Sequence, residues 1–215
     1  MRFTIITVTF FLFSIYALGQ QTKIVVIDPG HGGHDSGALG INGISEKDIV
    51  LRIALETEAL NALSKESHLQ IYLTRYTDTF ISLKDRSTIP KVLQADLFIS
   101  LHGNYSINPN ARGIEMYLYE QKNSFMTESL VFATCLENEF KSIIGFESRG
   151  IKIANFQVIK DVSKICKSVL FEIGFLSNSD EADYLDNSIE TIGSLLLKTI
   201  NENLKICLLY TSDAA

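Results

Sequence analysis

The sequence predicts an α/β fold: a single three-layer domain in which a mixed, mostly parallel β-sheet is flanked by helices on both faces. Short apolar runs typical of buried strands alternate along the chain with segments whose apolar residues recur at helical spacing. The chain has 215 residues, of which 46% are hydrophobic and 20% charged. This length and composition suit one domain of ordinary size with a sizeable core.

Apolar runs bounded by turn signals predict the strands. The first run ends at Asp28-Pro29-Gly30, where proline and glycine favour a turn. The run Ile114–Tyr119 is rich in β-forming residues, and we expect it to lie antiparallel, which would make the sheet mixed. The expected strands are Ile24–Asp28, Leu69–Leu73, Leu97–His102, Ile114–Tyr119 and Val169–Ile173, with a weaker candidate at Phe156–Ile159.

The clearest helix begins at Ser45, which resembles a capping box together with Asp48 three residues later. Further along this segment, residues recur at helical spacing and would face the core, namely Val50, Ile53, Ala54, Thr57 and Leu60. Two more long helices are expected, at Phe125–Phe140 and Ser188–Leu204.

The two ends of the chain are interpreted separately from the domain, which we assign to residues 20–206. Residues 1–19 hold one charge, Arg2, then an apolar run and small residues at Ala17 and Gly19, a pattern typical of a signal peptide. The alternative is a membrane anchor, but the run is shorter than the roughly 20 apolar residues that a spanning helix needs. The helical pattern is lost after Ile206, and we interpret residues 207–215 as a non-native tail.

Charge and cysteine content exclude some classes of site. The formal net charge is −6 and there is no basic cluster, which argues against nucleic acid as the main partner. The chain has three cysteines, Cys135, Cys166 and Cys207, two of which could pair in an exported protein. None lies in a C-x-x-C spacing, so a thiolate zinc site is not expected.

Two histidines lie at the ends of predicted strands. His31 comes directly after the turn at residues 28–30, and His102 ends another apolar run. In open α/β sheets, sites gather beyond the carboxyl ends of strands. Glu46 in the first turn of the Ser45 helix is the natural third ligand, although a first-turn acid also complements the helix dipole with no other role. Two imidazoles and a carboxylate suit a catalytic zinc ion, which keeps one position open for water.

Glu172 lies inside the apolar run that begins at Val169. A carboxylate in such a run is costly unless it is paired, hydrogen-bonded or bound to a metal. Burial also raises its pKa, which suits a general base or acid near neutral pH. The alternative is a structural glutamate paired with Arg or Lys, and the two histidines favour catalysis.

Other polar residues have competing interpretations. His34 lies in the same glycine-rich loop as His31, but we expect it to be exposed, and we expect the same of His68 in its polar stretch. Asp28 could accept a hydrogen bond from a ligand histidine or only make the turn. Asn104 could orient substrate or cap its loop.

Two arginines, Arg75 and Arg86, could bind a substrate carboxylate through both guanidinium nitrogens. We favour structural ion pairs with Asp78, Asp85 or Asp96.

Several blocks of sequence surround these candidates and follow one another from about Lys23 to Leu204. They are Ile24–Gly33 with Asp35 and Gly37, Glu46-Lys47, Leu73–Arg75 with Asp78, Ile81–Leu83 with Arg86, Ala95–Asn104, Gly113–Tyr117, Arg149–Lys152 and Val169–Asn178. In this order they resemble the zinc-dependent N-acetylmuramoyl-L-alanine amidases of the amidase-3 family. The positions Ser36, Gly103 and Lys167 depart from the family pattern, and none of them is a candidate ligand.

The resemblance implies that His31, Glu46 and His102 bind Zn²⁺ and that Glu172 is the catalytic glutamate. The implied reaction hydrolyses the amide between the lactyl group of N-acetylmuramic acid and L-alanine of the peptidoglycan stem. Zinc would activate water, and Glu172 would take the proton of the water and return it to the departing amine. Two alternatives stay open: a non-catalytic peptidoglycan-binding relative, and a zinc peptidase that cuts within stem peptides.

The resemblance also bears on access and location. Some relatives carry a long helical insertion that covers the zinc, whereas here about 30 residues separate Tyr119 from Arg149, so we expect an open site. We expect a monomer that is exported, either periplasmic or secreted, with no membrane contact once the signal peptide is removed. No wall-binding module is visible, so localisation would rest on substrate affinity, a localising or activating protein, or a lost C-terminal region.

Overall fold

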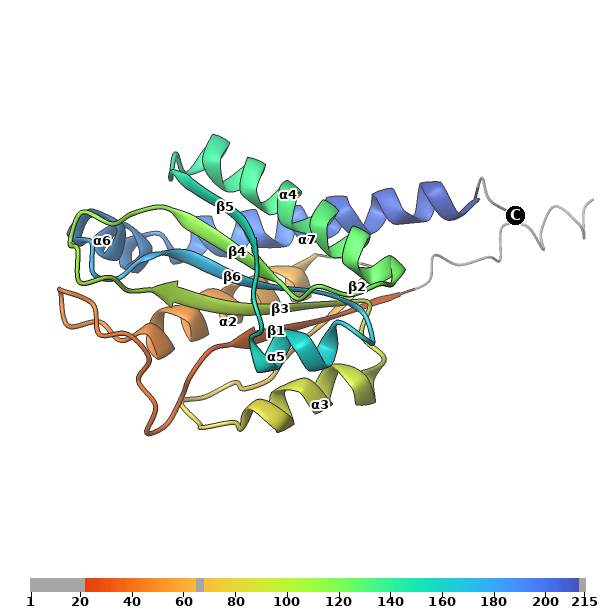
Figure 1. The fold of residues 1–215 in the computed structure, drawn as a ribbon, viewed down its shortest axis with the longest axis horizontal. Helices are drawn as coiled ribbons and strands as arrows, with labels where there is room; N and C mark the ends of the chain where they lie inside the picture. The colour runs from red at the N-terminus through yellow and green to blue at the C-terminus, as the bar shows by residue number, and fades with distance from the viewer. Residues whose placement is uncertain (1–21, 65–67, 213–215) are drawn as a thin grey trace, which may run out of the picture.

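The computed structural model describes residues 22–64 and 68–212, with side chains through residue 204. The predicted signal peptide lies outside these residues. Figure 1 shows three layers, with α4 and α7 above the sheet and α3 and α5 below it. The predicted fold class is therefore confirmed. Within the described ranges, no helix is long and apolar enough to cross a membrane.

The sheet has six strands in the order β2-β1-β3-β6-β4-β5. Neighbouring strands are parallel except β4 and β6, which are antiparallel, as expected for the run that begins at Ile114. The strands are β1 Lys23–Pro29, β2 Leu69–Leu73, β3 Leu97–Asn104, β4 Ile114–Leu118, β5 Ser148–Ile153 and β6 Lys167–Phe175.

Helices α2, α4 and α7 cover one face of the sheet, and α3 and α5 cover the other. The helices are α2 Glu46–Leu63, α3 Leu83–Leu93, α4 Ser124–Ile143, α5 Gln157–Val162, α6 Ser179–Asn187 and α7 Ile189–Ser212. Alternation along β3 sends Leu97, Ile99 and Leu101 into the first core and Phe98 into the second. His102 therefore lies on the face that α3 and α5 cover.

One predicted strand is wrong. Phe156–Ile159 opens α5, because Val158, Ile159 and Val162 recur at helical spacing and pack on the second core. The strand in this region is instead β5, which the sequence did not indicate. It lies at the edge of the sheet, and four of its six residues are charged or small, so it lacks the apolar run of a central strand.

Two helices were also missed. In α3, Pro90 inside the helix reads as a breaker, yet Ser82 caps the helix by accepting a hydrogen bond from the amide of Asp85 at 3.2 Å. In α6, the Asn178 side chain accepts bonds from the amides of Asp180 and Glu181. Both helices are short of apolar residues, which is why periodicity did not reveal them.

Two further expectations need correction. The Ser45 side chain caps no backbone amide of α2 and instead donates a hydrogen bond to the carboxylate of Asp48. The last helix does not stop near Ile206, since α7 stays helical through Ser212. The interpretation of residues 207–215 as a non-native tail stays a prediction.

Candidate metal centre

The topology places a crevice at the carboxyl ends of β1 and β3. From β1 the chain passes through α2 to β2 on one side, then through α3 on the opposite face to β3 on the other side. Adjacent strands whose connections leave in opposite directions frame such a crevice. His31 follows β1 directly, His102 lies near the end of β3, and Glu46 opens α2.

Two glycines make room for the imidazoles. A Cβ atom at Gly30 would lie 2.4 Å from Cε1 of His102. A Cβ atom at Gly37 would lie 2.4 Å from Oε2 of Glu46 and 2.6 Å from Cδ2 of His31. His31 itself adopts a left-handed backbone with φ of 58°, an uncommon conformation for a residue with a side chain. The tight turn after β1 thus turns the His31 ring toward the end of β3.

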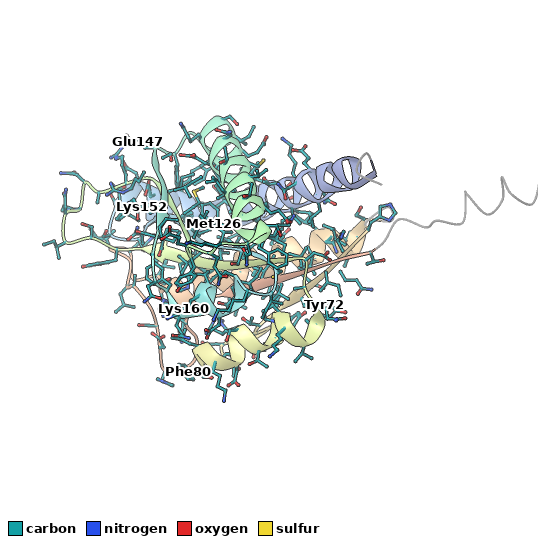
Figure 2. All side chains as sticks on the ribbon, turned by 45° about the vertical axis from the view of Figure 1, so that its right-hand side comes forward. Tyr72, Phe80, Met126, Glu147, Lys152 and Lys160 are labelled. Atoms are coloured by element: carbon teal, nitrogen blue, oxygen red, sulfur yellow. The ribbon has the colours of Figure 1, made fainter. Side chains whose placement is uncertain are left out.

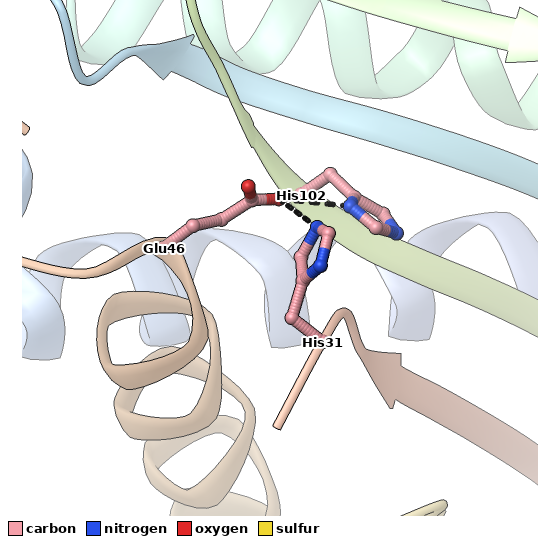
Figure 3. Close-up of side chains that lie close together, drawn as sticks. All are labelled: His31, Glu46 and His102. Atoms are coloured by element: carbon pink, nitrogen blue, oxygen red, sulfur yellow. Dashed lines mark hydrogen bonds and ion pairs between the residues drawn. The ribbon is translucent and has the colours of Figure 1, made fainter. Parts of the chain in front are cut away.

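His31, Glu46 and His102 converge on one point (Figure 3). Oε1 of Glu46 lies 3.1 Å from Nε2 of His31 and 2.8 Å from Nδ1 of His102. One potential ligand atom from each residue lies within 4.8 Å of the other two. The backbone amides of Gly103 and Ala38 also donate to the Glu46 carboxylate, at 3.0 and 2.8 Å, which fixes its orientation.

The charges of the three residues are strongly coupled. Burial opposes ionisation of Glu46, but hydrogen bonds from His102 and His31 outweigh it and hold the pKa of Glu46 well below its usual range. Burial likewise opposes protonation of His31, yet Glu46 and Asp35 raise the pKa of His31 to about 9. The pKa of His102 is raised in the same way. A buried carboxylate that attracts two protons to one point offers a cation the same stabilisation, so the donor set fits a metal ion.

Asp35 orients His31, a role that the sequence did not indicate. Its Oδ2 lies 2.8 Å from Nδ1 of His31, and its Oδ1 accepts a bond from the amide of Gly37 at 3.1 Å. A carboxylate on the second ring nitrogen of a ligand histidine fixes its tautomer and raises its basicity. In the sequence, Asp35 is marked only by its position four residues after His31 in a loop. Many aspartates without such a role have similar positions.

Within the part of the chain that the structure describes, Asp28 has no hydrogen bond to a histidine, so of its two suggested roles the one beside a ligand is wrong. It is buried and accepts bonds from Thr74, Ser100 and Arg86, at 2.5, 2.9 and 2.7 Å. Arg86 is thus a structural ion-pair partner, but of Asp28 rather than of the three aspartates expected.

The two arginines brace the turn after β1. Arg86 also donates to the carbonyls of Pro29 and His31. Among the described residues Arg75 forms no ion pair with Asp78, Asp85 or Asp96. It instead donates to the carbonyls of Pro29, Gly30 and Lys47, at 3.0, 2.8 and 2.8 Å. Both guanidinium groups therefore hold the backbone that carries His31.

Glu172 lies beside His102 on the neighbouring strand. The two residues are paired in the register of β3 and β6, so their side chains share a face of the sheet. Oε2 of Glu172 is buried and has no hydrogen-bond partner among the described residues. Burial raises the pKa of Glu172 to about 7. No Arg or Lys among the described side chains forms an ion pair with it, so the alternative of a structural ion pair finds no support.

The remaining histidines lie apart from this cluster. His34 is exposed, and its ring lies 4.3 Å from that of Phe80. His68 is also exposed.

The Asn104 side chain donates a hydrogen bond to Glu115 at 3.1 Å, and its Oδ1 accepts one from the amide of Tyr105 at 2.8 Å. Cys135 and Cys166 are both free thiols.

The centre opens into a cavity of about 380 Å³. His31 and His102 line it together with the apolar side chains Phe80, Ile81, Leu83 and Val158. The segment between β4 and β5 forms α4, which packs with α7 on the opposite face of the sheet. That segment leaves the centre uncovered, as its short length predicted.

Comparison with known proteins identifies the family. Residues 25–202 match the amidase-3 family model, described as N-acetylmuramoyl-L-alanine amidase. The chain belongs to this family. An endolysin of Bacillus phage SPP1 is 36% identical over 167 residues, which make up 77% of this chain and 59% of the endolysin.

Solved amidase-3 structures have the same fold. The catalytic domain of CwlV, an N-acetylmuramoyl-L-alanine amidase from Bacillus (Paenibacillus) polymyxa var. colistinus, superposes with a TM-score of 0.76 at 34% identity, covering 85% of this chain and 98% of that one. CwlD amidase from Clostridioides difficile, solved in complex with the GerS lipoprotein, gives 0.76 at 28% identity, covering 86% and 99%.

Proposed function

We propose that this protein is an exported zinc hydrolase that cleaves the amide between N-acetylmuramic acid and L-alanine in peptidoglycan. The observation that carries the proposal is the convergence of His31, Glu46 and His102 on one point, with Glu172 next to His102 in the sheet register. Membership of the amidase-3 family gives the substrate class. Residues 20–206 would be the catalytic domain, and residues 1–19 a signal peptide.

In this proposal His31, Glu46 and His102 hold Zn²⁺. A zinc ion there would supply Lewis acidity, which polarises the scissile carbonyl and acidifies water. Glu172 takes a proton from the attacking water and delivers it to the nitrogen of the departing L-alanine. A carboxyl group with a pKa near 7 can both accept and return a proton near neutral pH. Asp35, Arg75 and Arg86 keep His31 in place.

The proposed partner is peptidoglycan, acted on by a monomer in the periplasm or outside the cell. A second protein that localises or activates the enzyme is part of the proposal, and the complex of CwlD with a lipoprotein gives a precedent among similar structures.

Digestion of purified peptidoglycan with residues 20–206 and zinc tests the function. Mass spectrometry of the products should find free stem peptides that begin at L-alanine. Shortened stems still attached to muramic acid would indicate a zinc peptidase instead. Binding without any product, from folded protein that holds zinc, would indicate a non-catalytic peptidoglycan-binding relative or a missing activator.

A further inference from the structure

Two basic side chains on the edge strand β5 lie beside the proposed catalytic glutamate, and the proposed reaction gives them no role. Arg149 and Lys152 both contact Oε1 of Glu115, Lys152 at 3.0 Å. The Arg149 side chain is 43% exposed and that of Lys152 is 41% exposed, whereas that of Glu115 is only 4% exposed. One buried carboxylate therefore holds two cations whose side chains stay about two-fifths exposed.

Both carboxylate oxygens of Glu115 have hydrogen-bond partners. Its Oε2 accepts bonds from the Tyr117 hydroxyl at 2.5 Å and from the Asn104 amide at 3.1 Å. Burial opposes its ionisation, but hydrogen bonds from Tyr117, Arg149 and Lys152 lower the pKa of Glu115 to about 2. At neutral pH the cluster therefore carries two positive charges against one negative charge. The surplus positive charge is available to an anion.

The sheet register connects this cluster to the metal centre. Glu115 on β4 is paired with Glu172 on β6, and Glu172 is paired with His102 on β3. Side chains at paired positions point to the same face, so one row leads from the centre through Glu172 to the cations on β5. On the other side of the histidines, the cavity is lined by apolar residues including Phe80. In Figure 2, Lys152 lies on β5 and Phe80 on the opposite, lower side of the molecule.

The two cations are also held in place by aromatic rings. The Arg149 guanidinium carbon lies 5.1 Å from the centroid of the Phe175 ring, and Nζ of Lys152 lies 5.7 Å from that of Tyr117. An arginine fixed in this way keeps a planar fork of donors, which matches the geometry of a carboxylate.

We propose that Arg149 and Lys152 bind a free carboxylate of the stem peptide on the amine side of the scissile bond. The direction in which the peptide lies rests on the proposed amidase function. Because Glu172 protonates the departing amine, the peptide extends from Glu172 toward β5. The cations would then make the enzyme prefer stems with free carboxylates over stems in which these groups are amides.

Measuring peptide binding tests the proposed carboxylate site without any catalytic step. The probe is a synthetic stem peptide beginning at L-alanine with free side-chain carboxylates, compared by calorimetry with the same peptide carrying amides there. Charged hydrogen bonds at half-exposed side chains predict about 10-fold tighter binding of the free acid by wild type. The double variant R149Q/K152Q should bind both peptides equally. K198Q is the matched control, because Lys198 is 48% exposed and pairs with Glu139 on the other side of the sheet; it should keep the preference.

Hydrolysis of the two matching muramoyl-peptides gives the second readout. Wild type should show the preference mainly in KM, and R149Q/K152Q should lose it. The ratio of kcat/KM values within one preparation does not depend on the folded fraction. A preference that survives in R149Q/K152Q, or none in wild type, overturns the inference. A binding preference that is lost in the variant, with no hydrolysis by wild type, would instead refute the amidase and keep the carboxylate site.

Discussion

Replacing Asp35 with asparagine tests whether the carboxylate behind His31 strengthens the metal centre. Asparagine keeps the size of the side chain and an oxygen for the amide of Gly37, which Asp35 binds at 3.1 Å. It removes the negative charge that lies 2.8 Å from Nδ1 of His31. The neutral side chain neither raises the basicity of the imidazole nor fixes its tautomer as strongly.

Partners of this kind typically contribute about 10- to 100-fold in metal affinity. The Asp35 side chain is 44% exposed, so solvent screens its charge and the low end of this range applies. We therefore expect Asp35→Asn to weaken zinc binding about 10-fold, equivalent to about 1.4 kcal/mol. Folding stability should change little because the side chain is nearly half exposed and asparagine keeps its size.

Competition with a chromophoric zinc chelator measures this affinity independently of activity. Asp78→Asn is the matched control, since Asp78 is 47% exposed and accepts a bond from Gly33 in the loop of His31, at 2.7 Å, but has no hydrogen bond to any described histidine. Equal zinc affinity in wild type and Asp35→Asn, or an equal loss in both variants, would show that Asp35 does not strengthen the metal centre.

Two further predictions concern space and charge around the centre. Gly30→Ala should displace the His102 ring, because the added Cβ atom would lie 2.4 Å from it. We expect the variant to lose zinc binding and to be destabilised by about 1–3 kcal/mol in urea unfolding. Unchanged zinc affinity would contradict this prediction. Folding lowers the pKa of Glu115 from 4.5 to about 2, so its contribution to stability is complete above pH 4.5 and is lost as the pH falls toward 2. Between pH 7 and pH 3 wild type should therefore lose about 1–2 kcal/mol more than Glu115→Gln in urea unfolding, and equal losses would show that the cluster does not stabilise the fold.

The metal centre could be predicted because its residues occupy positions that sequence patterns mark. His31 follows β1 and His102 lies near the end of β3, both of which are central apolar strands, and Glu46 opens a helix whose buried residues recur at helical spacing. The parallel sheet then brings these three positions to one edge.

What the sequence did not indicate depends on contacts made only in three dimensions. Asp35 resembles any loop aspartate until the left-handed backbone at His31 brings the ring to it. Arg75 was expected to pair with an acid, but the folded turn offers it backbone carbonyls instead. β5 was not predicted because it is an edge strand, which packs against fewer neighbours than a central strand and therefore needs no apolar run.

The most direct test of the account separates chemistry from metal binding at Glu172. Wild type and Glu172→Gln should be compared at equal, measured zinc occupancy on one defined muramoyl-peptide. The variant should bind zinc as wild type does, because Glu172 is not in the ligand cluster, and its kcat should fall by at least about 100-fold, since it cannot accept the proton of the water. A zinc-loaded Glu172→Gln protein with unchanged kcat would contradict the mechanism.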